Sequence, residues 1–261
     1  MIEVSPSKKG ERWERIRLNA LKRYPLADIL LSDLLPADIA EWRDRRLTEN
    51  VEGSTVRREL ILMSGVFTRC RMEWNWINEN PVSFIQKPRP NNPRDRRINS
   101  DEVAAICKAS GYKIGTPIKT TTQLVGALFL LGIETGMRLG EMCKMRPFDI
   151  FLDERFVRLE NTKNTTNRTV SLSKDAGLIL NDVGAANRFV ASGVASSTFK
   201  KICKGAKIVG LRFHDTRHEA ITRLSRKLQI LDLAKMVGTK DLKTLMIYYN
   251  PTAQEIAARL D

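Results

Sequence analysis

Both histidines of this 261-residue chain lie in one short stretch, His214 to His218, with Arg217 between them. On a helix, residues three and four positions apart share a face, so the three side chains would point the same way. Such a face combines a proton-transfer group with a permanent cation, which suits an anion whose bonds are made and broken. Phosphate is the first candidate. A helix start with a basic face is the other interpretation, and this stretch alone does not choose between the two.

A second cluster contains the sequence T-G-x-R-x-x-E, from Thr135 to Glu141. Its glycine ends a strongly apolar segment, and Arg138 begins the next element. Arg138 and Glu141 lie three positions apart and can share a helix face. Taken alone, the pair is more typical of a surface ion pair than of a site.

Two further stretches contain reactive side chains. Lys163 falls in a polar turn, where a lone lysine is usually only solvated. Near the C-terminus a glycine closes one helix, and Thr239 or Asp241 can cap the next. Tyr248 and Tyr249 end that helix. Without other information, these tyrosines would be core or interface aromatics.

The helices and strands that must position these residues are predicted from their different patterns of apolar residues. Residues 122–132 are strongly apolar and predict a buried helix, and a helix over residues 100–108 has a serine first that can cap it. Residues 155–159 and 168–172 alternate between polar and apolar types around a polar turn at 161–167. This alternation predicts a β-hairpin.

The N-terminal part is predicted to be helical. One helix opens with Pro36 in its first turn, and Ser54 or Thr55 can cap a longer one. Trp74 and Trp76 are interpreted as core residues rather than base-stacking groups. The longer helix has one apolar stripe, formed by Val56, Leu60, Met63 and Phe67.

A proline- and arginine-rich segment divides the chain. Three prolines fall within six residues, Pro88 to Pro93, among arginines that keep the segment solvated or hold it against a polyanion. We interpret residues 88–97 as a basic linker between an N-terminal domain (1–87) and a C-terminal domain (98–261).

The charge balance indicates a polyanionic partner. Lys and Arg number 44 against 30 Asp and Glu, a net charge of +14. Nucleic acid is the leading candidate and an anionic membrane surface the second. The chain has no apolar run of about 18 residues and no apolar signal-peptide core, so we expect no membrane span and a cytoplasmic location.

The remaining composition argues against metals and disulfides. The four cysteines form no C-x-x-C pair, which indicates neither a disulfide framework nor a zinc site and fits a reducing compartment. No carboxylate cluster has the spacing of metal ligands, so a metal-dependent nuclease is disfavoured. We expect no cofactor and no metal.

The order of these motifs carries more information than any one of them. T-G-x-R-x-x-E, a hairpin lysine, H-x-x-R-H, a glycine turn and then Tyr248 closely resemble the tyrosine recombinase (phage integrase) family. Residues 54–60 and 73–77, before Asn80-Pro81, resemble that family's core-binding domain. The resemblance implies a mainly α fold with a small β-hairpin or sheet in the C-terminal domain: a helical core-binding domain followed by a catalytic domain.

The resemblance also implies roles for single residues. Tyr248 matches the nucleophile that forms a 3′-phosphotyrosine link to DNA, and Arg138 and Arg217 match the pair that clamps the scissile phosphate. Lys163 matches the lysine that protonates the leaving 5′-oxygen. His214 matches the general acid/base.

The supporting positions follow in the same way. Glu141 matches a supporting acidic position, and His218 is interpreted as structural or supporting. Counting from Thr239, which stands where the family usually has His or Trp, favours Tyr248 over Tyr249 as the nucleophile. Threonine has a donor with a shorter reach, so this departure puts the reaction rate in doubt.

The implied partners are double-stranded DNA with specific recombination sites, further copies of the chain as a dimer or tetramer on that DNA, and accessory DNA-bending proteins. Integration, excision and inversion stay open, as does an N-terminal truncation. The alternative is a weakened or inactive DNA-binding remnant with a regulatory role; a type IB topoisomerase-like activity is a third option. Candidate DNA-contacting residues are Arg57, Arg58, Arg94, Arg96 and Arg97.

Overall fold

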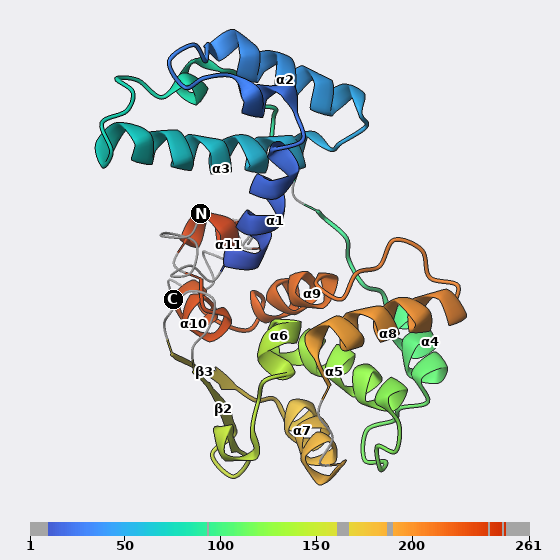
Figure 1. The fold of residues 1–261 in the computed structure, drawn as a ribbon. Helices are drawn as coiled ribbons and strands as arrows, with labels where there is room; N and C mark the ends of the chain where they lie inside the picture. The colour runs from blue at the N-terminus through green and yellow to red at the C-terminus, as the bar shows by residue number, and fades with distance from the viewer. Residues whose placement is uncertain are drawn as a thin grey trace, which may run out of the picture. The chain divides into compact units, whose positions relative to one another are not determined.

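The computed structural model describes residues 10–92, 94–160, 167–186, 190–239, 241–246 and 248, and is mainly helical with one small sheet. The predicted fold class is confirmed (Figure 1). The chain divides into two compact units, Met1–Arg94 (the first unit) and Asp95–Asp261 (the second unit). The division falls inside the segment predicted as a linker. Within the described residues, every helix is too short or too polar to cross a membrane.

The first unit packs its helices around one apolar cluster. Three members of the predicted stripe, Val56, Leu60 and Met63, are buried there together with Ile39 and Trp42. Phe67 is partly buried against the same cluster. The elements are α1 (Glu11–Leu21), η2 (Pro25–Asp28), α2 (Pro36–Thr48), α3 (Gly53–Met72) and η3 (Pro81–Phe84), where η denotes a short 3₁₀ helix.

Two predictions for this unit are wrong. Helix α3 begins at Gly53 after Glu52, and no side chain caps it, so neither Ser54 nor Thr55 has that role. Trp76 is exposed and Trp74 only half-buried, their ring centroids 4.6 Å apart. Asn75, between them, has a φ of 53°, in the left-handed region. The chain therefore turns away from the apolar stripe where α3 ends.

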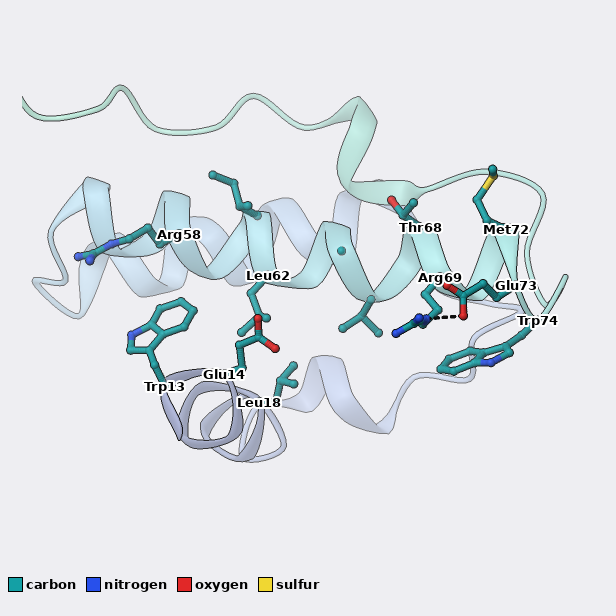
Figure 2. A pocket seen from close by; sticks show the side chains of 13 residues that line it. Trp13, Glu14, Leu18, Arg58, Leu62, Thr68, Arg69, Met72, Glu73 and Trp74 are labelled. Atoms are coloured by element: carbon teal, nitrogen blue, oxygen red, sulfur yellow. Dashed lines mark hydrogen bonds and ion pairs between the residues drawn. The ribbon is translucent and has the colours of Figure 1, made fainter. Parts of the chain in front are cut away.

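Helices α1 and α3 border a hollow of about 740 Å³ in the first unit (Figure 2). Apolar side chains from both helices line it, and an ion pair between Arg69 and Glu73 lies near the C-terminal end of α3. The apolar lining includes Trp13, Leu18, Leu62, Met72 and Trp74.

The second unit is built around α5 (Thr121–Thr135), the predicted buried helix. It packs against α4, α6, α7, α8 and α9 of the same unit (Figure 1). The other helices are α4 (Ser100–Ser110), α6 (Leu139–Met142), η4 (Pro147–Asp149), α7 (Lys174–Ala186), α8 (Ser192–Gly205), α9 (Asp215–Leu224), α10 (Ile230–Val237) and α11 (Leu242–Met246). Helix α4 is capped by Asn99, which accepts from the Glu102 N–H; the expected serine cap, Ser100, is already the first helical residue.

A close contact between α5 and α9 fixes the helix that carries the histidine motif. A Cβ on Gly132 of α5 would lie 2.7 Å from Oγ1 of Thr216 on α9. A larger residue would therefore push the two helices apart. Thr216 is buried at this contact, with its hydroxyl donating to the Phe213 carbonyl.

The predicted hairpin is confirmed as β2 (Phe156–Leu159) and β3 (Arg168–Ser171), which pair antiparallel with Val157 opposite Val170. A further strand, β1 (Ile150–Phe151), pairs with β2 and completes a sheet of order β1-β2-β3. Its two residues are too few to produce a recognisable alternation. Strand β3 packs against α10. Residues 161–166 between β2 and β3, including Lys163, lie outside the described residues.

Candidate active site

Arg217 is buried on α9 and is held by backbone carbonyl groups. Its guanidinium donates to the Gly136 oxygen at 2.6 Å and to the Val237 oxygen at 2.7 Å. These carbonyls stand at the C-terminal ends of α5 and α10, where helix carbonyls lack partners within the helix and carry the negative end of the dipole. The arginine therefore joins two helix ends through backbone carbonyl groups.

Arg217 stays positively charged although it is buried near two other arginines. Burial, followed by the neighbouring cations Arg138 and Arg168, lowers its pKa to about 10. It is still a cation at neutral pH. Three arginines in one partly desolvated region are suited to binding an anion.

Arg138 and Glu141 lie at the start of α6 and form a partly buried ion pair rather than the fully exposed surface pair that the sequence alone suggests. Glu141 accepts from the Arg138 backbone N–H at 2.8 Å and from its guanidinium at 2.9 Å. Both carboxylate oxygens also accept from Arg168, each at 2.9 Å. Burial alone would raise the pKa of Glu141, but the bonds from Arg168 and Arg138 outweigh it and lower the pKa.

Arg168 is a site residue that sequence reasoning missed. Its side chain is 6% exposed, and it also donates to the Met236 carbonyl at the end of α10. A usable signal existed: Arg168 shares a strand face with buried Val170, and an arginine on a core face requires a partner.

Gly238 makes room for the Arg168 side chain. It ends α10 with a left-handed φ of 68°, and an added Cβ would lie 2.7 Å from Cδ of Arg168. Any larger residue here would be strained and would displace the arginine.

His214 directly precedes α9 as its N-cap residue and has an exposed side chain. Partial loss of solvent, followed by the charges of Arg217 and Arg138, lowers the pKa of its imidazole. The ring is therefore largely neutral at neutral pH and able to accept a proton. His214 thus lies in the electrostatic field of both arginines.

Tyr248 lies half-buried beside the same helix. Its ring contacts the His218 ring edge-on, with centroids 4.8 Å apart, and its carbonyl accepts from the Ser225 hydroxyl at 3.0 Å. Burial raises the pKa of the Tyr248 hydroxyl, Arg217 lowers it and Asp95 raises it, with a net rise. The chain therefore brings Arg138, Glu141, Arg168, His214, Arg217 and Tyr248 into one electrostatically connected region.

Two models of known protein families match this chain. The description "Phage integrase family" matches residues 96–255, and "Phage integrase, N-terminal domain" matches residues 7–89. The chain belongs to the phage integrase family.

Similar proteins agree with this assignment. A Haemophilus influenzae protein named as an integrase/recombinase is 38% identical, over 99% of this chain and 86% of its own length. The shufflon-specific DNA recombinase of Escherichia coli is 33% identical, over 99% of this chain and 68% of its own length. This phage integrase is therefore a tyrosine-type site-specific recombinase, and an inactive remnant is not favoured.

Solved structures share its fold. A lambda integrase dimer bound to a COC′ core site superposes with a TM-score of 0.74 at 17% identity, over 94% of this chain and 72% of that one. The Tn1549 transposon integrase in complex with a circular intermediate DNA gives 0.76 at 16% identity, over 97% and 93%. At these identities the likeness concerns the fold.

The remaining predicted site residues of this phage integrase have one long contact or lie outside the described part of the chain. The Thr239 hydroxyl lies 3.4 Å from the Asp241 carbonyl, and Lys163 and Tyr249 lie outside the described residues. In the described part of the chain, no cluster of His, Cys, Asp and Glu could hold a metal ion.

The candidate DNA-contacting arginines differ in their contacts. In the first unit, Arg57 donates to the Pro88 carbonyl and exposed Arg58 to Ser54. Arg94 is exposed. Arg96 pairs with Glu102 and Arg97 with Glu219, so both already hold a carboxylate.

Proposed function

We propose that this recombinase cuts and rejoins double-stranded DNA at specific sites through a covalent link between Tyr248 and a 3′-phosphate. The observation that carries the proposal is the group of cations beside Tyr248. Burial raises the pKa of Tyr248 and the charge of Arg217 opposes that rise, while Arg217 itself lies in the field of Arg138 and Arg168. A phosphodiester is the DNA group that this excess of positive charge suits.

The reaction follows from the side-chain chemistry. The Tyr248 oxygen attacks phosphorus and loses its proton, and the bond from phosphorus to the 5′-oxygen breaks. The leaving oxygen takes up a proton and becomes a 5′-hydroxyl. The phosphotyrosine retains the energy of the phosphodiester bond, so a second 5′-hydroxyl can reverse the step without ATP.

The arginines act on the phosphate. Negative charge grows on the two non-bridging oxygens as phosphorus becomes five-coordinate, and the guanidinium groups of Arg138 and Arg217 donate to them. Because Arg217 is fixed by two carbonyl groups, little reorganisation is needed when the phosphate arrives. Glu141 orients Arg138 and compensates Arg168.

Proton transfer is assigned to two residues. His214, with its lowered pKa, is neutral near pH 7 and accepts the tyrosine proton. Lys163 donates to the leaving 5′-oxygen. Thr239 supplies a weaker donor than the usual His or Trp, and loss of one transition-state donor costs about 3 kcal/mol.

The proposed assembly is a dimer or tetramer on DNA. Residues 1–87 would act as the DNA-clamping domain, residues 98–261 as the catalytic domain and residues 88–97 as the linker. Phosphate contacts are proposed for Arg57, Arg58, Arg94, Arg96 and Arg97. Lambda integrase, which shares the fold, has been crystallised as a tetramer bound to a Holliday junction. Accessory DNA-bending proteins are further proposed partners.

A nicked DNA pool tests the proposal. Duplexes randomised on both sides of a nick lose a short strand once cleaved, so the covalent adduct accumulates and can be seen on a denaturing gel. Wild-type protein should form an adduct with enriched sequences, and Tyr248→Phe should form none. Tyr249→Phe is the matched control and should retain the adduct. An adduct that persists in Tyr248→Phe and disappears in Tyr249→Phe contradicts the assignment.

A further inference from the structure

Glu219 anchors the start of the second unit to α9. Its buried carboxylate accepts from the Arg97 guanidinium at 2.8 and 3.3 Å and from the Ile98 backbone N–H at 3.1 Å. Arg223, one turn further along α9, donates to it at 2.7 Å. The segment that follows the boundary between the units is therefore fixed to the helix that carries Arg217.

This anchor brings Asp95 beside His218. Asp95 lies two residues before Arg97, and its Oδ1 is 3.5 Å from Nε2 of His218. The Asp95 side chain is 91% exposed, whereas that of His218 is 14% exposed. The pair therefore lies at the edge of the site, with the carboxylate on the solvent side and the imidazole inside.

His218 in turn contacts the ring of Tyr248. The two rings meet at 69° with centroids 4.8 Å apart. The other ring nitrogen of His218, Nδ1, is buried and has no hydrogen-bond partner among the described residues. In the described part of the chain, the orientation of this imidazole therefore depends on packing and on Asp95.

We propose that Asp95 is a positioning residue for the cleavage reaction: its carboxylate orients His218, and the His218 ring supports the ring of Tyr248. This inference rests on Tyr248 being the nucleophile. The Ser225 hydroxyl holds the Tyr248 backbone from the end of the same helix. Helix α9 thus fixes the main chain of the tyrosine directly and its ring through His218.

A direct electrostatic effect of Asp95 has the opposite sign. The carboxylate contributes to the raised pKa of Tyr248, after burial and against Arg217, and so disfavours the phenolate. Removing Asp95 would therefore speed attack if this field were its main influence, and slow it if positioning dominates. The direction of the rate change distinguishes the two roles.

The test measures single-turnover adduct formation on the nicked DNA pool with full-length protein. Asp95→Ala should slow adduct formation about threefold to fivefold, the size expected for loss of one contact from an exposed carboxylate. DNA affinity in a mobility-shift assay should stay unchanged, and Asp95→Glu should restore most of the rate. Asp153→Ala, another exposed acid of the second unit, is the matched control and should match wild type.

A double-mutant cycle identifies the route of the effect. His218→Phe keeps a ring against Tyr248 but removes the partner of Asp95, so Asp95→Ala should have no further effect in that background. The positioning role of Asp95 is wrong if Asp95→Ala forms the adduct at the wild-type rate or faster. It is also wrong if Asp95→Ala slows the reaction equally in the His218→Phe background. Neither result affects the assignment of Tyr248 as the nucleophile. If Tyr248→Phe still forms the adduct, the proposed nucleophile fails and this inference fails with it.

Discussion

Glu141, whose side chain is 10% exposed, and buried Glu219 each hold two arginines, yet they differ in where those arginines lie. The partners of Glu141 are Arg168, which is 6% exposed, and Arg138, which is 28% exposed. The partners of Glu219 are 49% and 43% exposed. One ion-pair network is therefore directed inward, and the other reaches solvent.

The difference separates a ligand site from an anchor. Around Glu141, two arginines share one carboxylate, and Arg217, held by two backbone carbonyls, adds a third cation. That excess of charge is screened weakly and favours an incoming anion. Around Glu219 the excess charge is solvated and screened, so the network stabilises the fold without creating a binding site.

The largest effect should come from Glu141→Gln. This change leaves the buried Arg168 guanidinium without a counter-charge, and breaking a buried pair costs about 3–5 kcal/mol. Denaturant unfolding should show this loss of stability. Glu160→Gln is the matched control, because Glu160 and its partner Arg146 are both exposed and should change stability by less than about 1 kcal/mol. Equal losses of unfolding free energy for the two variants would contradict the claim that the Glu141 ion pairs are shielded from solvent.

A second test compares one arginine from each network. Arg138→Gln should slow adduct formation about 10²–10³-fold, because a donor to the transition-state charge is lost. Arg223→Gln removes an arginine of the same type from the Glu219 network and should stay within about threefold. Single-turnover rates on the nicked DNA pool measure both. The distinction between site and anchor fails if Arg223→Gln is as slow as Arg138→Gln.

Much of the site was predictable from sequence, because its members belong to short local motifs. The resemblance of their order and spacing to the family's motifs led to Arg138, His214, Arg217 and Tyr248, and hydrophobic period predicted the hairpin and the central helix. Arg168 was not, because its partner Glu141 lies 27 residues away and only the folded sheet brings them together.

The other differences also come from tertiary structure. The exposure of Trp76 depends on a left-handed residue at the end of α3, whereas an aromatic residue in a sequence suggests burial. The anchor at Glu219 joins residues 121 or more positions apart. No periodic pattern marks such a contact before the chain is folded.

The smallest of these effects concerns pH and the Glu219 anchor. Burial would raise the pKa of Glu219, but bonds from Arg97, Arg223 and the Ile98 N–H lower it from 4.5 to about 2. A carboxyl group whose pKa is lowered on folding stabilises the protein above its unfolded pKa and loses that contribution as pH falls towards the folded value. Glu219→Gln should therefore destabilise the protein by about 2–3 kcal/mol at pH 7. In denaturant unfolding from pH 7 downwards, the gap to wild type should stay constant to about pH 4.5 and then narrow. If the difference in unfolding free energy keeps its full size below pH 4.5, the Glu219 side chain stabilises the fold through packing and not through its charge. Glu219 would then not be comparable with Glu141 as a charged partner of arginines.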